Sequence, residues 1–256
     1  MRDPSVATFG RRAVLSSSAA LSAVFSTLAL GPLPALSISA TTMTGKTKPE
    51  LGIVLLDEVS ATGKSISANV ILDGGLIATP TFSTKWPLAE GGYYDIEAST
   101  RDGETAYLQV APLGKGESFA TLPKTWFANA LFAVDGRYGA YGAPSDVKLK
   151  EIDKDGTART FEVAFTVLSP GMSELPRKGL VRAIQPPGST DVLMLLCSAG
   201  PTRWAKNGAD AEARSTIESF RIASTAPTAL KREASADYRY GKTSGPSTMK
   251  SRNDGF

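Results

Sequence analysis

The chain has 256 residues, of which 42% are hydrophobic and 21% are charged, and its formal net charge at pH 7 is +3. This length is enough for one ordinary hydrophobic core with tails. One cysteine excludes an internal disulfide, and zero histidines remove the commonest general base and the commonest transition-metal ligand.

The positive charge is concentrated at the two ends of the chain. Residues 1–40 hold three basic and one acidic side chain, and residues 223–256 hold six and three. The segment between them holds 19 basic and 21 acidic side chains and is therefore close to neutral. It lacks the basic face that a nucleic-acid partner needs, so we expect no nucleic-acid binding.

Residues 1–40 have the parts of a twin-arginine export signal. Arg11 and Arg12 precede an uncharged run at residues 13–30, and residues 34–37 offer a small-x-small cleavage site. The alternative is a membrane anchor, but alanine and serine dilute the apolar run. We expect a cleaved signal, after which the protein is peripheral to the membrane and does not span it.

Residues 41–80 predict a polar linker followed by a hairpin. Apolar runs at 51–56 and 66–72 are separated by Gly63-Lys64-Ser65, and Asp73-Gly74-Gly75 indicates a further turn. A phosphate-binding loop would need a glycine five residues before Gly63, where this chain has Glu58, so a turn is favoured.

The middle of the chain predicts two more hairpins with a helix between them. Residues 93–99 and 105–111 flank a turn containing Asp-Gly, and residues 147–152 and 159–168 flank a second one. Phe127, Ala130, Leu131 and Val134 form one stripe of a helix at 122–134. Residues 170–178 are predicted to be a loop.

The segment 191–222 predicts the centre of the fold. Residues 192–197 are apolar on both sides of an extended segment, as in a strand buried in the middle of a sheet. After Trp204, the apolar residues Ala209, Ala213 and Ile217 recur at helical spacing. Residues 223–256 have no periodicity, so we expect a disordered tail that begins where the chain leaves the fold.

The same segment carries a resemblance to a known family. A hydrophobic strand ending in a cysteine, a small-residue turn, Arg203-Trp204-x-Lys206 and a helix closing on Ser219-Phe220 resemble the C-terminal end of the PsbP family, the lumenal extrinsic proteins of photosystem II. Strands at 161–168 and 180–184, the segment 82–87 and the segment 141–147 resemble earlier parts of that family in the same order. The resemblance covers residues 81–222.

The resemblance implies an α+β fold in which a central antiparallel β-sheet is flanked by helices, which the hairpins and helices of this sequence also predict. It implies a non-catalytic extrinsic or assembly protein of photosystem II in the chloroplast thylakoid lumen. The alternatives are service to another thylakoid complex, export from a bacterium by the twin-arginine route, or an exported small-ligand-binding protein or enzyme. The ten residues before Arg11 are too few for a plastid transit sequence, so we expect either a truncated product or a bacterial export.

The candidate partner-binding residues are Lys178, Arg203, Trp204 and Lys206. The three cations are basic groups that would dock on an acidic surface, and Trp204 lies between Arg203 and Lys206 after a Gly-Pro turn. Trp204 also fits a core position, and Cys197 fits inert packing. The resemblance implies calcium or manganese association, but where some relatives have a histidine this chain has Arg177-Lys178-Gly179. We therefore expect no cofactor, no metal site and no catalytic residue.

Overall fold

The structure is a computed structural model that describes residues 52–57, 59–89, 96–134 and 136–231. These residues all belong to one compact unit, Ile38–Phe256. The predicted signal at 1–40, with Arg11 and Arg12, lies outside the described residues, as do most of the predicted linker and the end of the predicted tail. None of the helices in the described ranges is long and apolar enough to cross a bilayer.

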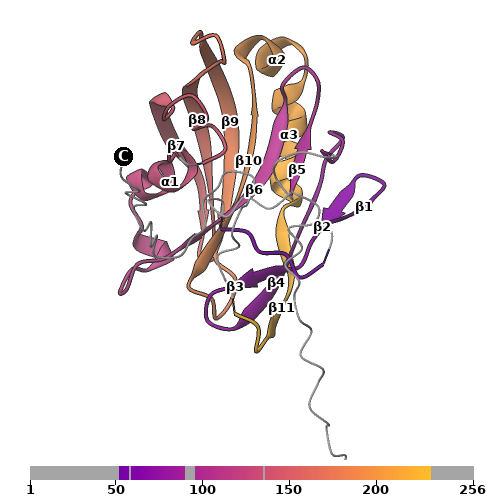
Figure 1. Ribbon diagram of the computed structural model, residues 1–256, viewed down its shortest axis with the longest axis vertical. Helices are drawn as coiled ribbons and strands as arrows, with labels where there is room; N and C mark the ends of the chain where they lie inside the picture. The colour runs from indigo at the N-terminus through magenta and orange to yellow at the C-terminus, as the bar shows by residue number, and fades with distance from the viewer. Residues whose placement is uncertain (1–51, 58, 90–95, 135, 232–256) are drawn as a thin grey trace, which may run out of the picture. The chain divides into compact units, whose positions relative to one another are not determined.

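A six-stranded antiparallel sheet forms the larger part of the described chain (Figure 1). Its strand order is β5-β6-β10-β9-β8-β7. The strands are β5 (Glu97–Ser99), β6 (Thr105–Pro112), β7 (Ser145–Asp155), β8 (Ala158–Leu168), β9 (Glu174–Ile184) and β10 (Asp191–Ala199). Every residue of β10 is buried, and β10 pairs with β6 on one side and β9 on the other. The predicted buried central strand is confirmed.

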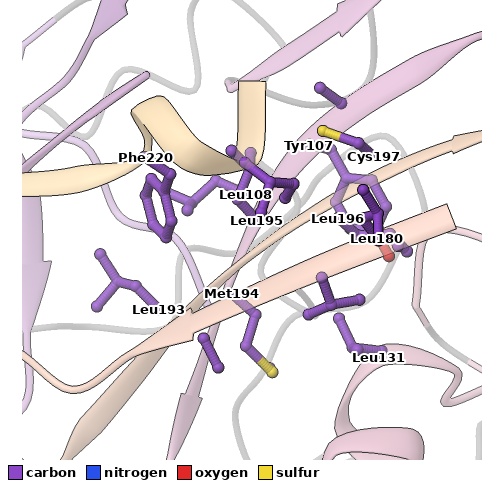
Figure 2. Packing of buried hydrophobic residues seen from close by; sticks show 14 of the residues in the cluster. Tyr107, Leu108, Leu131, Leu180, Leu193, Met194, Leu195, Leu196, Cys197 and Phe220 are labelled. Carbon is purple, nitrogen blue, oxygen red and sulfur yellow. The ribbon is translucent and has the colours of Figure 1, made fainter. Parts of the chain in front are cut away.

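Helices lie on both faces of this sheet, as predicted for an α+β fold. On one face, Phe127 of α1 (Lys124–Leu131) contacts Phe161 of β8 at 4.7 Å between ring centroids. On the other face, α3 (Ala209–Ser219) packs against β9 and β10. Figure 2 shows the two sides of the core: Met194 lies on the side of Leu131 from α1, and Leu195 lies on the side of Phe220 after α3.

The predicted hairpins β5–β6 and β7–β8 are present, with Gly103 of the first turn at φ 88°. The second hairpin is longer than predicted, because residues 153–155 belong to β7. Helix α1 is shorter than the predicted 122–134. It ends at Leu131, and Val134, which was placed on its core-facing stripe, is 64% exposed.

A loop predicted at 170–178 is wrong, because β9 begins at Glu174. The first part of β9 is exposed and carries proline and charged residues, so it lacks the hydrophobic alternation that indicates a strand. Its backbone groups nevertheless pair with β8, for example at Ala164 opposite Lys178. Lys178 is therefore a strand residue.

A second antiparallel sheet joins the N-terminal and C-terminal parts of the described chain. It contains β1 (Ser60–Thr62), β2 (Ser65–Ser67), β3 (Val70–Leu72), β4 (Leu76–Ser83) and β11 (Arg221–Pro227). The predicted pairing of 51–56 with 66–72 is present in a short form. Leu55 forms an antiparallel bridge with Val70, and the amides of Leu56 and Ile71 donate to the carbonyls of Asn69 and Val54. The second run is split into β2 and β3, and both also pair with β4.

The predicted exit of the chain at Phe220 and the predicted start of disorder at 223 are also wrong. Phe220 is buried, and β11 continues to Pro227 along the edge of β4. Five of the seven residues of β11 are exposed, so its sequence shows no apolar alternation. Helix α3 contacts β4 as well as β9 and β10 and thus lies between the two sheets.

Candidate functional site

A solvent-open groove of about 390 Å³ lies on the face of the six-stranded sheet that carries α3. We call it the basic groove and define it by Lys148, Lys150, Glu162, Lys178, Trp204 and Arg214. Its floor includes Ala164 of β8. The groove therefore combines four cations, one carboxylate and one aromatic ring.

The register of three neighbouring strands brings the groove residues together. Lys148 of β7 lies opposite Ala164 of β8, and Ala164 lies opposite Lys178 of β9. Lys150 lies opposite Glu162 in the same way. Since side chains alternate between the two faces of a strand, residues 148, 150, 162, 164 and 178 all project to the side of α3.

Trp204 forms one wall of the groove from the short helix α2 (Pro201–Lys206). Gly200 precedes this helix, and Pro201 occupies its first turn, where the missing N–H costs nothing. The Trp204 side chain is half-buried and packs against the edge of the core. Its packing agrees with the predicted core position, while its place on a partner-binding surface stays a prediction.

The charges of the groove are only partly compensated. Glu162 lies 3.6 Å from Lys150 Nζ and 3.9 Å from Arg214 Nη2, and Arg214 also pairs with Asp210 at 3.0 Å. Lys148 and Lys178 are exposed and form no ion pair with any residue in the described ranges. Their strand positions lie on either side of a small residue, Ala164.

Arg203, a predicted partner-binding residue, is held by acids of the same chain. Its Nε donates to Glu104 Oε1 at 2.6 Å and its Nη2 donates to Asp102 Oδ2 at 2.7 Å. Burial alone would raise the pKa of Glu104, but hydrogen bonds from Arg203 and Thr100 outweigh it and lower that pKa below its ordinary value. Arg203 thus ties α2, and with it Trp204, to the β5–β6 turn.

Of the other predicted residues, Lys178 and Trp204 line the groove, while Lys206 is exposed at the end of α2 and is not among the lining residues. The sequence reasoning missed Lys148, Lys150 and Arg214. A signal for the first two existed: they alternate with the half-buried Val147 and Leu149, which places both lysines on one face of a strand. Arg214 is distant in sequence, so no spacing connects it with them.

A cluster of hydroxyl groups lies at one end of the sheet, on the face that carries α1. Ser198 and Tyr138 are 2.6 Å apart between hydroxyl oxygens, and Thr105 is within 3.2 Å of both. Arg177 donates to Ser198 Oγ and to the Gly103 carbonyl, and its guanidinium lies over the Tyr138 ring. These groups satisfy one another, so the cluster joins the strand ends rather than offering a nucleophile to solvent.

Cys197 is fully buried in β10, and burial raises the pKa of its thiol well above the ordinary value, with the charge of Glu212 adding to the effect. A thiol in this state is a packing group. Among the described residues no group of three or more Cys, Asp and Glu side chains is placed to hold a metal ion.

The chain is structurally similar to cyanobacterial PsbP (CyanoP) from Synechocystis sp. PCC 6803, known from a solution structure. The similarity covers 65% of this chain and 98% of that one, with 13% sequence identity and a TM-score of 0.37. No protein-family model matches the sequence. No curated protein matches it either.

Proposed function

We propose that this chain is a non-catalytic extrinsic or assembly protein of photosystem II in the thylakoid lumen, where it supports oxygen evolution. The observation that carries the proposal is the arrangement of the segments that resemble the PsbP family. Those at 161–168, 180–184 and 191–222 fall on β8, β9, β10 and the helices after β10, which are neighbours both in sequence and in the fold. The resemblance thus describes one continuous structural unit.

The charge distribution supports attachment to a surface rather than catalysis. The middle of the chain is nearly neutral, yet exposed Lys148 and Lys178 share one groove with an aromatic ring. Exposed charges of this kind give orientation and a fast encounter with an acidic surface more than high affinity. The partners are lumenal subunits of photosystem II, and the protein is peripheral to the membrane once its signal is removed.

The proposal includes no cofactor. Where some members of the family have a histidine, this chain has Arg177 and Lys178. The guanidinium of Arg177 donates hydrogen bonds to Ser198 and to the Gly103 carbonyl, and Lys178 is an exposed cation. Neither is a metal ligand at neutral pH. Calcium or manganese association is implied by the resemblance alone.

One observation favours a second candidate function, an exported protein that binds a small ligand. The volume of the basic groove, about 390 Å³, falls in the range of about 300–1,000 Å³ that is usual for ligand sites. Such a protein would be found free in the compartment to which it is exported. Location therefore separates the two candidates.

The test is fractionation of thylakoids from the source organism. Inside-out vesicles are washed with increasing salt, and the protein is followed by immunoblotting beside an integral subunit of photosystem II as control. We expect release at high salt, because the Debye length shrinks from about 10 Å at 0.1 M to about 3 Å at 1 M. Retention through the wash would contradict charge-based attachment, and presence in the soluble lumen fraction before any wash would favour the ligand-binding candidate.

A further inference from the structure

We propose that the basic groove binds an extended acidic segment of a partner protein, which lies across β7, β8 and β9 with carboxylates at Lys148 and Lys178 and a side chain against Trp204. The identification of that partner as a lumenal subunit of photosystem II rests on the proposed function. The chemistry of the segment rests on the groove itself.

The spacing of the two free lysines fits an extended chain. Lys148 and Lys178 are separated by two strand spacings, about 10 Å between their backbones, with Ala164 between them. Carboxylates two residues apart in an extended segment lie about 7 Å apart on the same side, and flexible lysine side chains can close the difference.

The charge pattern of the groove favours a carboxylate ligand. Glu162 already has two cationic neighbours, Lys150 and Arg214, so it does not repel an incoming acid as a free carboxylate would. Lys148 and Lys178 have no acidic partner among the described residues, so an acidic segment adds ion pairs without breaking existing ones.

Trp204 supplies the apolar part of the site. Its ring is half-buried against the core, so its position is fixed before binding, and its remaining surface faces the groove. Arg203, on the same helix, is held by Glu104 and Asp102, and this fixes the direction from which the ring enters the groove. Tryptophan is one of the residue types that most often dominate the binding energy of protein interfaces.

The first arm of the test measures binding of a fluorescein-labelled heptapeptide of alternating glutamate and alanine by fluorescence anisotropy at low salt. We expect the parent protein to bind it, and the doubly charge-reversed variant K148E/K178E to bind about tenfold more weakly. The matched control is K64E/K115E, which makes the same change in net charge at exposed lysines outside the groove. The control is expected to stay within about twofold of the parent.

Equal weakening in the two variants would overturn the proposal, since it would show attraction to net charge only. Displacement of the peptide by an equal concentration of inorganic phosphate would also overturn it, in favour of a small-anion site. Thermal melting checks that the charge-reversed variant is folded. If it is not, K148Q/K178Q takes its place, with an expected loss of about threefold.

The second arm uses photosystem II particles stripped of extrinsic proteins. We expect the parent and K64E/K115E to rebind and K148E/K178E to rebind poorly. Rebinding of K148E/K178E at the parental level would show that the groove is not the docking site, while leaving the proposed function intact. If the peptide binds in the groove but the parent protein does not rebind to photosystem II, the proposed function fails. The groove would then still be a site for an acidic segment, but of another partner.

Discussion

Replacing Arg159 with Met tests how α1 is held to the sheet. Arg159 lies on β8, is only 4% exposed, and its Nε donates to Glu151 Oε1 at 2.6 Å. Its Nη1 donates to the carbonyl oxygens of Phe119 and Leu122 at 3.3 and 2.8 Å, just before α1. The guanidinium also lies over the ring of Phe127, 4.7 Å from its centroid. One buried side chain therefore links two strands to the start of a helix.

Methionine keeps most of the packing of this side chain but removes every donor. Glu151 and the two carbonyl groups then lose their partner, and breaking a buried pair from one side costs about 3–5 kcal/mol. Because the Glu151 side chain is 26% exposed and keeps some contact with water, we place the cost at the lower end, about 3 kcal/mol. We expect the R159M variant to lose free energy of unfolding of about this size in urea titrations followed by circular dichroism. Arg221, which is exposed on β11, provides the matched control R221M, with an expected change within about 0.5 kcal/mol.

The effect of Arg159 depends on pH in a defined direction. The hydrogen bond from Arg159 lowers the pKa of Glu151 below its ordinary value of 4.5, against the opposing effect of burial. A lowered pKa in the folded state gives stability that is complete above pH 4.5 and is lost as the pH falls through the lowered value. The difference between parent and R159M should therefore narrow below pH 4.5. A difference of less than about 1 kcal/mol at pH 7 would refute the reasoning, because such a small loss cannot come from a buried pair.

Three further predictions concern other parts of the chain. Gly179→Ala should destabilise the fold by about 1–3 kcal/mol in a urea titration, because the added Cβ would lie 2.4 Å from the Cys197 carbonyl oxygen. Gly156→Ala is the control and should be nearly neutral, because there is open space around that position. Cys197 should not react with a thiol reagent in the native protein and should react fully in urea; native labelling at the rate of a free thiol would contradict its burial. Replacing Arg11 and Arg12 with Lys should block import into isolated thylakoids, and unchanged import would remove the twin-arginine interpretation.

The parts of the fold that could be predicted from the sequence are those in which the pattern of apolar residues or the turn residues indicates burial or a turn. Residues 192–197 are apolar on both faces, which identified β10 as a buried strand. The Asp-Gly turns indicated two hairpins. In the first, Gly103 has the positive φ that glycine adopts without strain, whereas Gly156 in the second turn has no positive φ, so there the reason for the prediction did not apply.

The parts that could not be predicted are strands formed mainly by backbone pairing. β11 and the first part of β9 are exposed, so their side chains show little hydrophobic alternation. Both are strands because their backbones pair with a neighbour: β11 with β4, which is distant in sequence, and β9 with β8, the preceding strand. For the same reason the sequence after Phe220 was predicted to leave the fold. That segment is a strand because it pairs with the edge of β4.

The candidate site shows the same limit for charged residues. Lys178 and Arg203 are equivalent in the sequence, since both are cations near the predicted central strand. The structure separates them, because Arg203 meets two acids of the β5–β6 turn while Lys178 faces Ala164 and open space. Which cation is free to bind a partner thus depends on contacts between segments about a hundred residues apart.

The position of α3 explains why a groove exists at all. On its face of the six-stranded sheet, α3 packs against β9 and β10 and lies between this sheet and β4. β7 and β8 lie at one end of the sheet, where residues that project to this face are charged or small, such as Lys148, Lys150 and Ala164. On the opposite face the same strand β8 presents Phe161 and Phe165 to the core. One set of alternating residues of β8 therefore belongs to the core, and the other set forms the floor of the groove. A substitution such as Ala164→Leu should fill the groove and weaken peptide binding, while the core on the other face stays unchanged.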